Sequence, residues 1–349
     1  MSGILNYETL QILWFLLWGL LWAIYFILDG FDLGMGTLLP FIAKANEERR
    51  VVFNAAGPYW DGNEVWLITA GGVTFAAFPL AYAVMFSSLY APLLILLFAL
   101  IFRAVSFEFR NKIDNPQWRS LWDGVQFLGS FLPALLLGVA FANLFMGIPI
   151  NENGVFMGTI LSLLNVYGLA GGVFFVVMFA LHGSIWLAIK SEGVMHDRAL
   201  AYDRMLWPVL TALAVVFLIA SKFSTPLYDN YFKPPVLLIV PILAVLLLFL
   251  LRFFIAGKML KASFFCSAGF ILFVTFFGII GMFPNIIPSN LTSEAHITIA
   301  KSASSELTLT IMLAVALVCV PIVILYQSWV YWLFSHKVTE EVLDSEHSY

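Results

Sequence analysis

The sequence predicts an all-α polytopic membrane protein with about nine transmembrane helices. Of its 349 residues, 62% are hydrophobic and only 11% are charged, and the mean hydropathy is +0.95. Soluble domains carry about 25% charged residues, so a water-soluble fold could not bury this much apolar surface. The apolar residues form continuous runs and not the alternating pattern of membrane β-barrel strands. Because backbone in lipid must satisfy its own hydrogen bonds, we expect the runs to be helices.

Nine apolar runs are long enough to cross the hydrocarbon core, which takes about 20 residues. We expect one integral-membrane domain over 1–349, with helices near 9–28, 57–78, 80–102, 122–146, 160–188, 204–222, 235–253, 261–283 and 307–333. The second run is the weakest, because it begins with the polar residues 60–64 and turns apolar only at Val65. The first has no Lys or Arg before it and no small-residue cleavage site after it, so we expect a retained span and not a signal peptide.

Lys and Arg are distributed unevenly between the two sides that nine spans create. With the N-terminus outside, 14 of the 17 Lys and Arg residues fall in inside segments and 3 in outside segments. The positive-inside rule therefore predicts a periplasmic N-terminus and a cytoplasmic C-terminus. The net charge of −4, with no basic patch, gives no reason to expect nucleic acid as a partner. Cys266 and Cys319 lie in separate apolar runs without metal-type spacing, so we expect them to be packing residues.

Charged residues in or beside the predicted spans are informative, because each costs about 2.5–3.5 kcal/mol at the centre of a membrane helix. Asp29 and Asp32 follow the first span and are three residues apart, so on a helix they share a face. A pair of solvated acids at a helix end and a functional pair fit the sequence equally well. Asp61 and Glu64 open the second run, where the helix dipole favours acids. The dipole does not explain why polarity continues through residues 63 and 64.

Two further polar residues stand inside or directly after apolar runs. Arg103 follows about 20 apolar residues, so its side chain either reaches the interface or neutralises a buried carboxylate. His182 is alone in the fifth run and has no second His or Met at a pairing distance. We therefore expect His182 to be a hydrogen-bonded packing residue and not a haem or metal ligand. The triplet 122–124 repeats the Trp-Asp-Gly of 60–62, a weak indication of an internal repeat.

The predicted topology brings these acids together. Spans one and three end on the inner face and spans two and four begin there, so Arg103 and the acids of four helix ends share one side. A half-buried carboxylate cluster facing an arginine is suited to proton uptake, and a purely structural charge network is the rival interpretation. Two functions fit: a proton- or cation-coupled transporter, or a non-catalytic subunit of a respiratory enzyme. A transporter should carry its polar residues near the midplane, which mildly favours the second.

Several motifs resemble those of subunit II of the cytochrome bd family of quinol oxidases. Residues 30–36 read GFDLGMG and residues 57–67 read GPYWDGNEVWL, and these two blocks are the most specific. Weaker matches follow in the family's order and end near the C-terminus, at residues 102–110, 282–284, 288–289, 304–309 and 320–332. The resemblance therefore covers nearly the whole chain, and the family's nine spans agree with the number of apolar runs.

The resemblance implies a subunit of a quinol:oxygen oxidoreductase that reduces oxygen to water in the bacterial cytoplasmic (inner) membrane. It implies two four-helix bundles plus one peripheral helix, surrounded by lipid and paired with subunit I. The b-type and d-type haems and the quinol-oxidising loop would belong to subunit I. This chain would have no complete active site and would ligate no haem or metal. Some family members also carry a small single-span subunit or a structural quinone in subunit II.

The same resemblance implies a proton pathway along this chain. Asp61 lies in the most specific motif, and Arg103 and Glu108 lie in the ending of the third predicted helix. We rank Glu64 below Asp61, because Gln also occurs at that position in the family. Trp66 would border an oxygen path. The proton-pathway candidates are Asp61, Arg103, Glu108, Asp29, Asp32 and Glu64.

Overall fold

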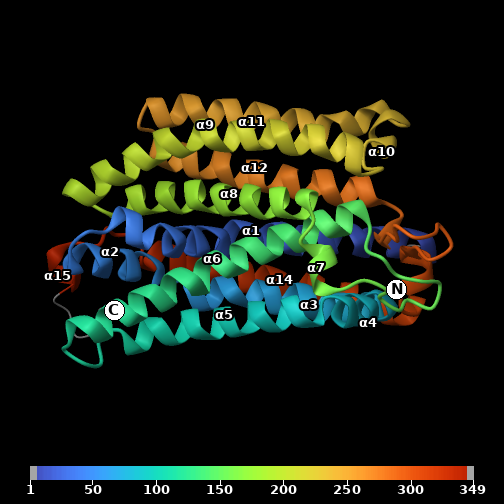
Figure 1. Ribbon diagram of the computed structural model, residues 1–349, viewed down its shortest axis with the longest axis horizontal. Coiled ribbons are helices and arrows are strands. Elements are labelled where there is room, and N and C mark those ends of the chain that lie inside the picture. Colours follow the sequence, from blue (N-terminus) through green and yellow to red (C-terminus); the bar gives the residue numbers. More distant parts are fainter. Residues whose placement is uncertain (1–5, 344–349) are drawn as a thin grey trace.

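The computed structural model describes residues 6–343, which fold almost entirely into helices (Figure 1). The elements are α1 (Tyr7–Ile42), α2 (Asn46–Ala56), α3 (Trp60–Ala77), α4 (Pro79–Ser88), α5 (Tyr90–Phe109), α6 (Pro116–Met146), α7 (Ile160–Leu163), α8 (Val166–Lys190), α9 (Gly193–Ser224), α10 (Asp229–Phe232), η1 (Pro235–Leu238), α11 (Ile239–Ala256), α12 (Leu260–Met282), β1 (Asn285–Ile287), β2 (Ile297–Thr298), α13 (Ile299–Ser302), α14 (Glu306–Leu333) and α15 (Glu340–Leu343). The predicted all-α membrane class is confirmed.

Within residues 6–343, eight helices are long and apolar enough to cross a membrane: α1, α5, α6, α8, α9, η1 with α11, α12 and α14. The second predicted span corresponds to α3, which is helical for 18 residues but is not among the eight. Its polar first turn lowers its hydropathy. The third predicted span is divided at Leu89 into α4 and α5. Pro92 explains the break, because proline cannot donate to the carbonyl of residue 88.

Two helices extend well beyond the apolar runs that predicted them. The first predicted span ends at residue 28, whereas α1 continues to Ile42 and places Asp29 and Asp32 inside the helix. The sixth begins at residue 204, whereas α9 begins at Gly193. In both helices the extension contains acids that are buried against neighbouring helices. A hydropathy scale assigns an unfavourable value to each acid, because it contains no information about the residues that bind it, and so it ends the predicted span too early.

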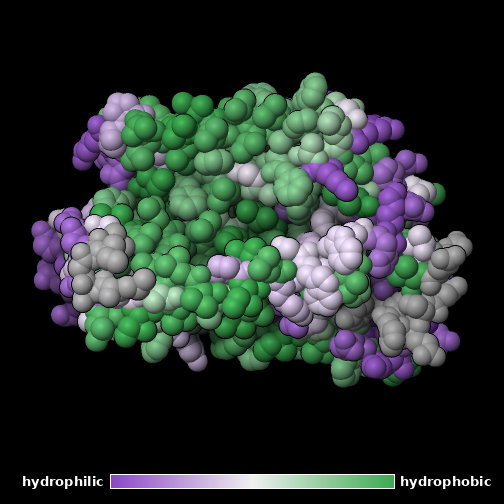
Figure 2. Space-filling model, turned by 180° about the vertical axis from the view of Figure 1, so that it is seen from behind, coloured by the Kyte–Doolittle hydropathy of each residue, from purple (hydrophilic) through white to green (hydrophobic). Residues whose placement is uncertain are grey.

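The helices are stacked in layers that run roughly parallel to the long axis (Figure 1). α9 and α11 form one side, α8 and α12 follow, α1 lies in the middle, and α6, α3, α14 and α5 complete the other side. α1 passes very close to α8 at Gly34, where a Cβ atom would lie only 1.8 Å from the carbonyl oxygen of Phe179. Only glycine permits this approach. Seen from behind, apolar residues cover the middle of the surface and hydrophilic residues gather at its two ends (Figure 2). This banding is typical of a protein surrounded by lipid.

We call the end of the molecule that contains α2 and α15 the α2 end. There, the ammonium group of Lys190 donates to Tyr59 Oη (2.7 Å), to the carbonyl oxygen of His336 (3.2 Å) and to that of Phe334. Tyr59 Oη also donates to the Phe334 carbonyl oxygen (2.6 Å). Because the last carbonyl groups of a helix lack intrahelical donors, Lys190 caps the end of α14 and fixes it against α8.

An ion pair joins α2 to α9 at the same end. The carboxylate of Glu48 accepts hydrogen bonds from Arg198 Nη1 (2.7 Å) and Nη2 (3.2 Å) and from the backbone N–H groups of residues 44 (2.5 Å) and 45 (3.2 Å). The hydrogen bond from Arg198 is the main cause that lowers the pKa of Glu48 from 4.5 to about 2. A lowered acid pKa contributes stability that is complete above the unfolded-state pKa and is lost as the pH falls through the folded-state value.

We therefore expect Glu48→Gln to lower the unfolding temperature of the purified protein at pH 6, and we expect this difference from wild type to shrink as the pH falls from about 4.5 towards 2. Thermal unfolding followed by tryptophan fluorescence across this pH range checks the prediction. Glu152→Gln, at an exposed position in the loop before α7, is the matched control. A difference between Glu48→Gln and wild type that stays constant with pH would contradict it.

Candidate functional site

A buried arginine joins α1, α3 and α5 through two carboxylates. Arg103 Nη2 donates to Asp29 Oδ1 (2.6 Å) and to Glu64 Oε2 (2.9 Å). The side chains of Arg103 and Asp29 are 0% exposed, and that of Glu64 is 22% exposed. Arg103 therefore neutralises a buried carboxylate, one of the two alternatives that the sequence leaves open, and does not reach the membrane interface. We call Asp29, Glu64 and Arg103 the Arg103 cluster.

Asp32 lies one turn along α1 from Asp29 and has different partners. Its Oδ2 accepts a hydrogen bond from Asn63 Nδ2 (2.7 Å), and Asn63 Oδ1 accepts one from Tyr331 Oη (2.8 Å). The side chains of Asp32 and Asn63 are buried, and within residues 6–343 Asp32 forms no ion pair. Asp32 is thus a buried acid whose hydrogen bonds come from neutral groups.

Several polar atoms of these buried groups lack a protein partner. Asp32 Oδ1 has no hydrogen-bond partner among the described residues, and neither do Arg103 Nε and Nη1, whereas the Asp29 carboxyl group has the Tyr25 hydroxyl group as a neighbouring donor. Leaving a buried polar atom unsatisfied costs about 1–3 kcal/mol, so atoms of this kind are expected to bond water or to exchange protons. Carboxyl groups with a free oxygen beside a fixed positive charge can take up and release protons without moving the helices.

The other proton-pathway candidates lie at the surface of the chain. Asp61 is exposed in the first turn of α3, three residues before Glu64, so both carboxylates project from the same face of that helix. Glu108 is exposed near the end of α5, beyond Arg103. Asp61 and Glu108 are therefore outside the hydrogen-bonded Arg103 cluster, and Glu64, the candidate ranked lower, is inside it.

Two further residues singled out in the sequence are fixed by hydrogen bonds. Trp66 is buried, and its Nε1 donates to Gln327 Oε1 of α14 (2.9 Å). His182 is fully buried, with Nε2 donating to the carbonyl oxygen of Ile27 (3.0 Å) and Nδ1 lying 2.5 Å from Ser267 Oγ. Both ring nitrogens of His182 are thus in use, as expected for a packing residue. No group of three or more His, Cys, Asp or Glu side chains that could hold a metal ion occurs in residues 6–343.

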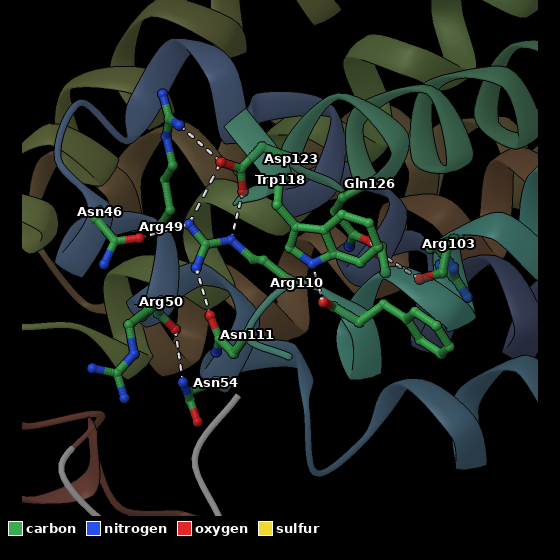
Figure 3. A network of polar contacts seen from close by, with 12 residues as sticks. Asn46, Arg49, Arg50, Asn54, Arg103, Arg110, Asn111, Trp118, Asp123 and Gln126 are labelled. Atoms are coloured by element: carbon green, nitrogen blue, oxygen red, sulfur yellow. Dashed lines mark hydrogen bonds and ion pairs between the residues drawn. The ribbon is translucent and has the colours of Figure 1, made fainter. Parts of the chain in front are cut away.

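A second charged network lies beside the Arg103 cluster (Figure 3). Arg110 Nε donates to Asp123 Oδ1 (2.6 Å), Arg49 Nη1 donates to Asp123 Oδ2 (2.8 Å), and Arg110 Nη2 donates to Asn46 Oδ1 (3.0 Å). The sequence placed Asp123, the acid of a repeated triplet, among the acids of four helix ends that were expected to face Arg103. In the structure its partners are Arg110 and Arg49 instead. The network links α2 and α6 to the end of α5, and its carboxylate is shared by two arginines.

One buried acid is not among the residues predicted from the sequence. Asp203 of α9 is 0% exposed, and its Oδ1 accepts a hydrogen bond from Ser184 Oγ of α8 (2.5 Å). Asp203 lies directly before the sixth predicted span, 204–222, and the sequence gave no separate prediction for it. The sequence does contain a signal that could have placed it in the helix, because apolar residues 195, 199, 200 and 206 recur at helical spacing through the polar segment 193–206.

Comparisons with known proteins agree with the motifs. The family model described as "Cytochrome bd terminal oxidase subunit II" matches residues 10–334. The "Probable cytochrome oxidase subunit 2" of Haemophilus influenzae is 37% identical, over 99% of this chain and 99% of that protein. The "Cytochrome bd-I ubiquinol oxidase subunit 2" of Escherichia coli K12 is 36% identical (97% and 98%), and the "Cytochrome bd ubiquinol oxidase subunit 2" of Bacillus subtilis is 35% identical (95% and 98%).

The fold is similar to that of a solved oxidase. A chain of the bd oxidase from Geobacillus thermodenitrificans superposes with a TM-score of 0.77, at 14% identity, over 93% of this chain and 98% of that one. At this low identity the superposition supports the fold alone. The family match and the three relatives, each covered nearly completely, carry the assignment. The chain therefore belongs to the subunit II family of cytochrome bd terminal oxidases.

Proposed function

We propose that this chain is the non-haem-ligating subunit II of a quinol:oxygen oxidoreductase, and that it conducts protons from the cytoplasm towards the site of oxygen reduction. Family membership favours an oxidase subunit over the proton- or cation-coupled transporter that the sequence left open. The observation that carries the proton path is the buried Arg103, which bridges the carboxylates of Asp29 and Glu64.

The proposed path begins at the surface and becomes more buried with each carboxyl group. Asp61 is exposed, the Glu64 side chain is 22% exposed, and Asp29 is fully buried. Glu108 adds a further negative charge near the opening, and Asp32 lies one turn along α1 from Asp29. Arg103 offsets the charge of the buried acids, so that a proton can leave them without creating an uncompensated negative charge in lipid.

The orientation of the chain in the membrane is part of this proposal. The segments near the α2 end contain most of the Lys and Arg residues, so we place that end in the cytoplasm and the N-terminus in the periplasm of a bacterial inner membrane. The whole chain is taken as one integral-membrane domain. Its proposed partner, by family membership, is a subunit I that ligates b-type and d-type haems. In this chain, both ring nitrogens of His182 are committed to Ile27 and Ser267.

An apolar cavity of about 570 Å³ lies among α1, α3, α4, α5 and α6, and we propose it as the site of a structural quinone. Trp18, Trp22, Phe75 and Met85 are among its lining residues. Trp22 Nε1 is buried without a protein acceptor, so it is a suitable donor for a quinone carbonyl group.

A Cβ atom at Gly72, which lines this cavity, would meet nothing within 4 Å. Gly72→Trp is therefore expected to fill the cavity and to remove quinone from solvent extracts of the purified complex.

The first experiment tests the proposed complex directly. The chain is affinity-tagged in its native host, extracted in mild detergent and examined by subunit mass and by a reduced-minus-oxidised spectrum. We expect b- and d-type haem bands together with a second large membrane subunit. A chain that is isolated alone and colourless would overturn the oxidase assignment, and cation-flux assays would then test the transporter.

Asp61→Asn is expected to lower oxygen consumption by about two- to tenfold and to leave the yield of the complex unchanged. The amide keeps the shape of the carboxyl group, and the lost charge is exposed, so assembly does not depend on it. An exposed acid at the opening of the path accelerates proton delivery but can be bypassed by water. Turnover with excess quinol, divided by haem content, is the measurement. Loss of the complex would instead show that Asp61 is structural.

A further inference from the structure

α14 is held to the rest of the chain mainly at its two ends. In the most apolar stretch of this helix only 6% of the residues are buried, and Leu309 is the one buried residue of the whole helix. Near its second end, Gln327 accepts a hydrogen bond from Trp66 and donates to the carbonyl oxygen of Gly62 (2.8 Å), and Tyr331 donates to Asn63. These three contacts all involve the first two turns of α3, which also carry Glu64. A peripheral helix is thus linked to the turns that hold the buried acids.

The hydrogen bonds from Tyr331 to Asp32 form a chain with a fixed direction. Tyr331 Oη donates to Asn63 Oδ1 (2.8 Å), and Asn63 Nδ2 donates to Asp32 Oδ2 (2.7 Å). The Tyr331 ring packs against the rings of Tyr59 and Trp186, with centroid distances of 4.6 Å and 5.8 Å. This packing fixes the position of the Tyr331 hydroxyl group beside Asn63. A side-chain amide has one acceptor and one donor end, and Tyr331 occupies the acceptor end.

Occupation of the acceptor end restricts where Asp32 can carry a proton. If the Asn63 amide turned over, its oxygen would face Asp32 and could accept a proton from Oδ2. While Tyr331 donates to that oxygen, Asn63 presents only N–H to Oδ2, which favours the negative charge on Oδ2 and a proton on Oδ1 of Asp32. Asp32 Oδ1 is the oxygen that has no protein partner among the described residues. The two oxygen atoms of Asp32 thus differ: Oδ2 is held by Asn63, and Oδ1 is the favoured position for proton exchange.

We propose that Tyr331 is a positioning residue for Asp32: by donating to Asn63 Oδ1, the stronger acceptor of the amide, it favours the orientation in which Asp32 exchanges its proton through Oδ1. This proposal rests on the proposed proton path and deepens it by assigning a role to α14. Without the Tyr331 hydroxyl group, the amide is free to turn, Oδ2 becomes a competing proton position, and a fraction of the Asp32 side chains is held in an unproductive hydrogen bond. The expected loss in turnover is about two- to tenfold, which corresponds to one neutral hydrogen bond.

Tyr331→Phe in the purified, haem-containing complex tests the proposal, because it keeps the packed ring and removes only the donor. Tyr326→Phe is the matched control, since Tyr326 lies on the same helix and its side chain is exposed. We expect Tyr331→Phe to show two- to tenfold slower oxygen consumption and a larger solvent deuterium isotope effect. The haem spectrum and the KM for quinol should match wild type, because these quantities do not depend on proton delivery.

A double-variant cycle separates positioning from simple packing. If Tyr331 acts through Asn63, then Tyr331→Phe with Asn63→Ala is no slower than Asn63→Ala alone. Additive losses, wild-type turnover of Tyr331→Phe, or failure of that variant to assemble would each overturn the proposal. Asp32→Asn distinguishes the two levels of the argument. Wild-type turnover of Asp32→Asn would remove Asp32 from the path and the proposal with it, whereas slow Asp32→Asn with normal Tyr331→Phe overturns the positioning role alone.

Discussion

Arg103→Ala is expected to prevent accumulation of the assembled complex. The substitution removes the cation that faces Asp29 and Glu64 and leaves a fully buried carboxylate without a counter-charge. Removing one partner of a buried ion pair costs about 3–5 kcal/mol, a large fraction of the roughly 5–15 kcal/mol that stabilises a folded domain. The haem content of solubilised membranes per milligram of protein, together with the amount of tagged chain on a blot, measures the effect.

Two comparisons show whether charge is the cause. Arg119→Ala removes an arginine whose partner Asp114 is 92% exposed, so it should change the yield little. The triple variant Arg103→Met, Asp29→Asn and Glu64→Gln removes the cation and both acids together. If an unpaired buried charge is what destabilises Arg103→Ala, the triple variant should recover much of the lost yield. Normal yield of Arg103→Ala alone would mean that the buried acids do not need its charge.

The location of this site was predictable from the sequence, but its pairing was not. Hydropathy and the Lys and Arg distribution placed Arg103, Asp29 and Glu64 at one end of the molecule, and they do form one cluster. The choice between Asp61 and Glu64 depends on how α3 is rotated against α5. That rotation is set by packing between helices, and the period of one helix carries no information about it. The motif therefore drew attention to the first turn of α3, which carries both acids, but ranked the exposed Asp61 above Glu64, the one that contacts Arg103.

Long-range contacts account for most of what the sequence could not predict. Tyr331 and Asn63 are 268 residues apart, and no local pattern indicates that α14 ends beside the first turn of α3. The continuation of α1 to Ile42 was missed for a related reason. Taken without their partners, Asp29 and Asp32 indicate the polar end of a helix. A continuous buried helix is possible because Arg103 and Asn63 bind these two carboxylates. Contacts between different helices thus determine both the Tyr331–Asn63 hydrogen bond and the length of α1.

Asp29→Asn is expected to reduce oxygen consumption at least tenfold, and up to about a hundredfold, in a complex that still assembles with normal haem bands. The amide preserves the shape of the carboxyl group and can still accept a hydrogen bond from Arg103, while Glu64 continues to pair with the same guanidinium. Assembly should therefore survive. The amide cannot take up a proton at this position, and a positioned acid or base contributes about a hundredfold or more to the rate of the step it serves.

The ranking of the acid variants tests the order of the path. Asp29 is fully buried and has no bypass through bulk water, whereas Asp61 is exposed, so Asp29→Asn should be the slower of the two. Asp29→Glu, which restores a titratable group one methylene further from the backbone, should recover part of the turnover. Full activity of Asp29→Asn would show that the Arg103 cluster is a structural charge network. In that case Arg103→Ala would still fail to assemble, so the two variants together separate what the cluster does for stability from what it does for proton transfer.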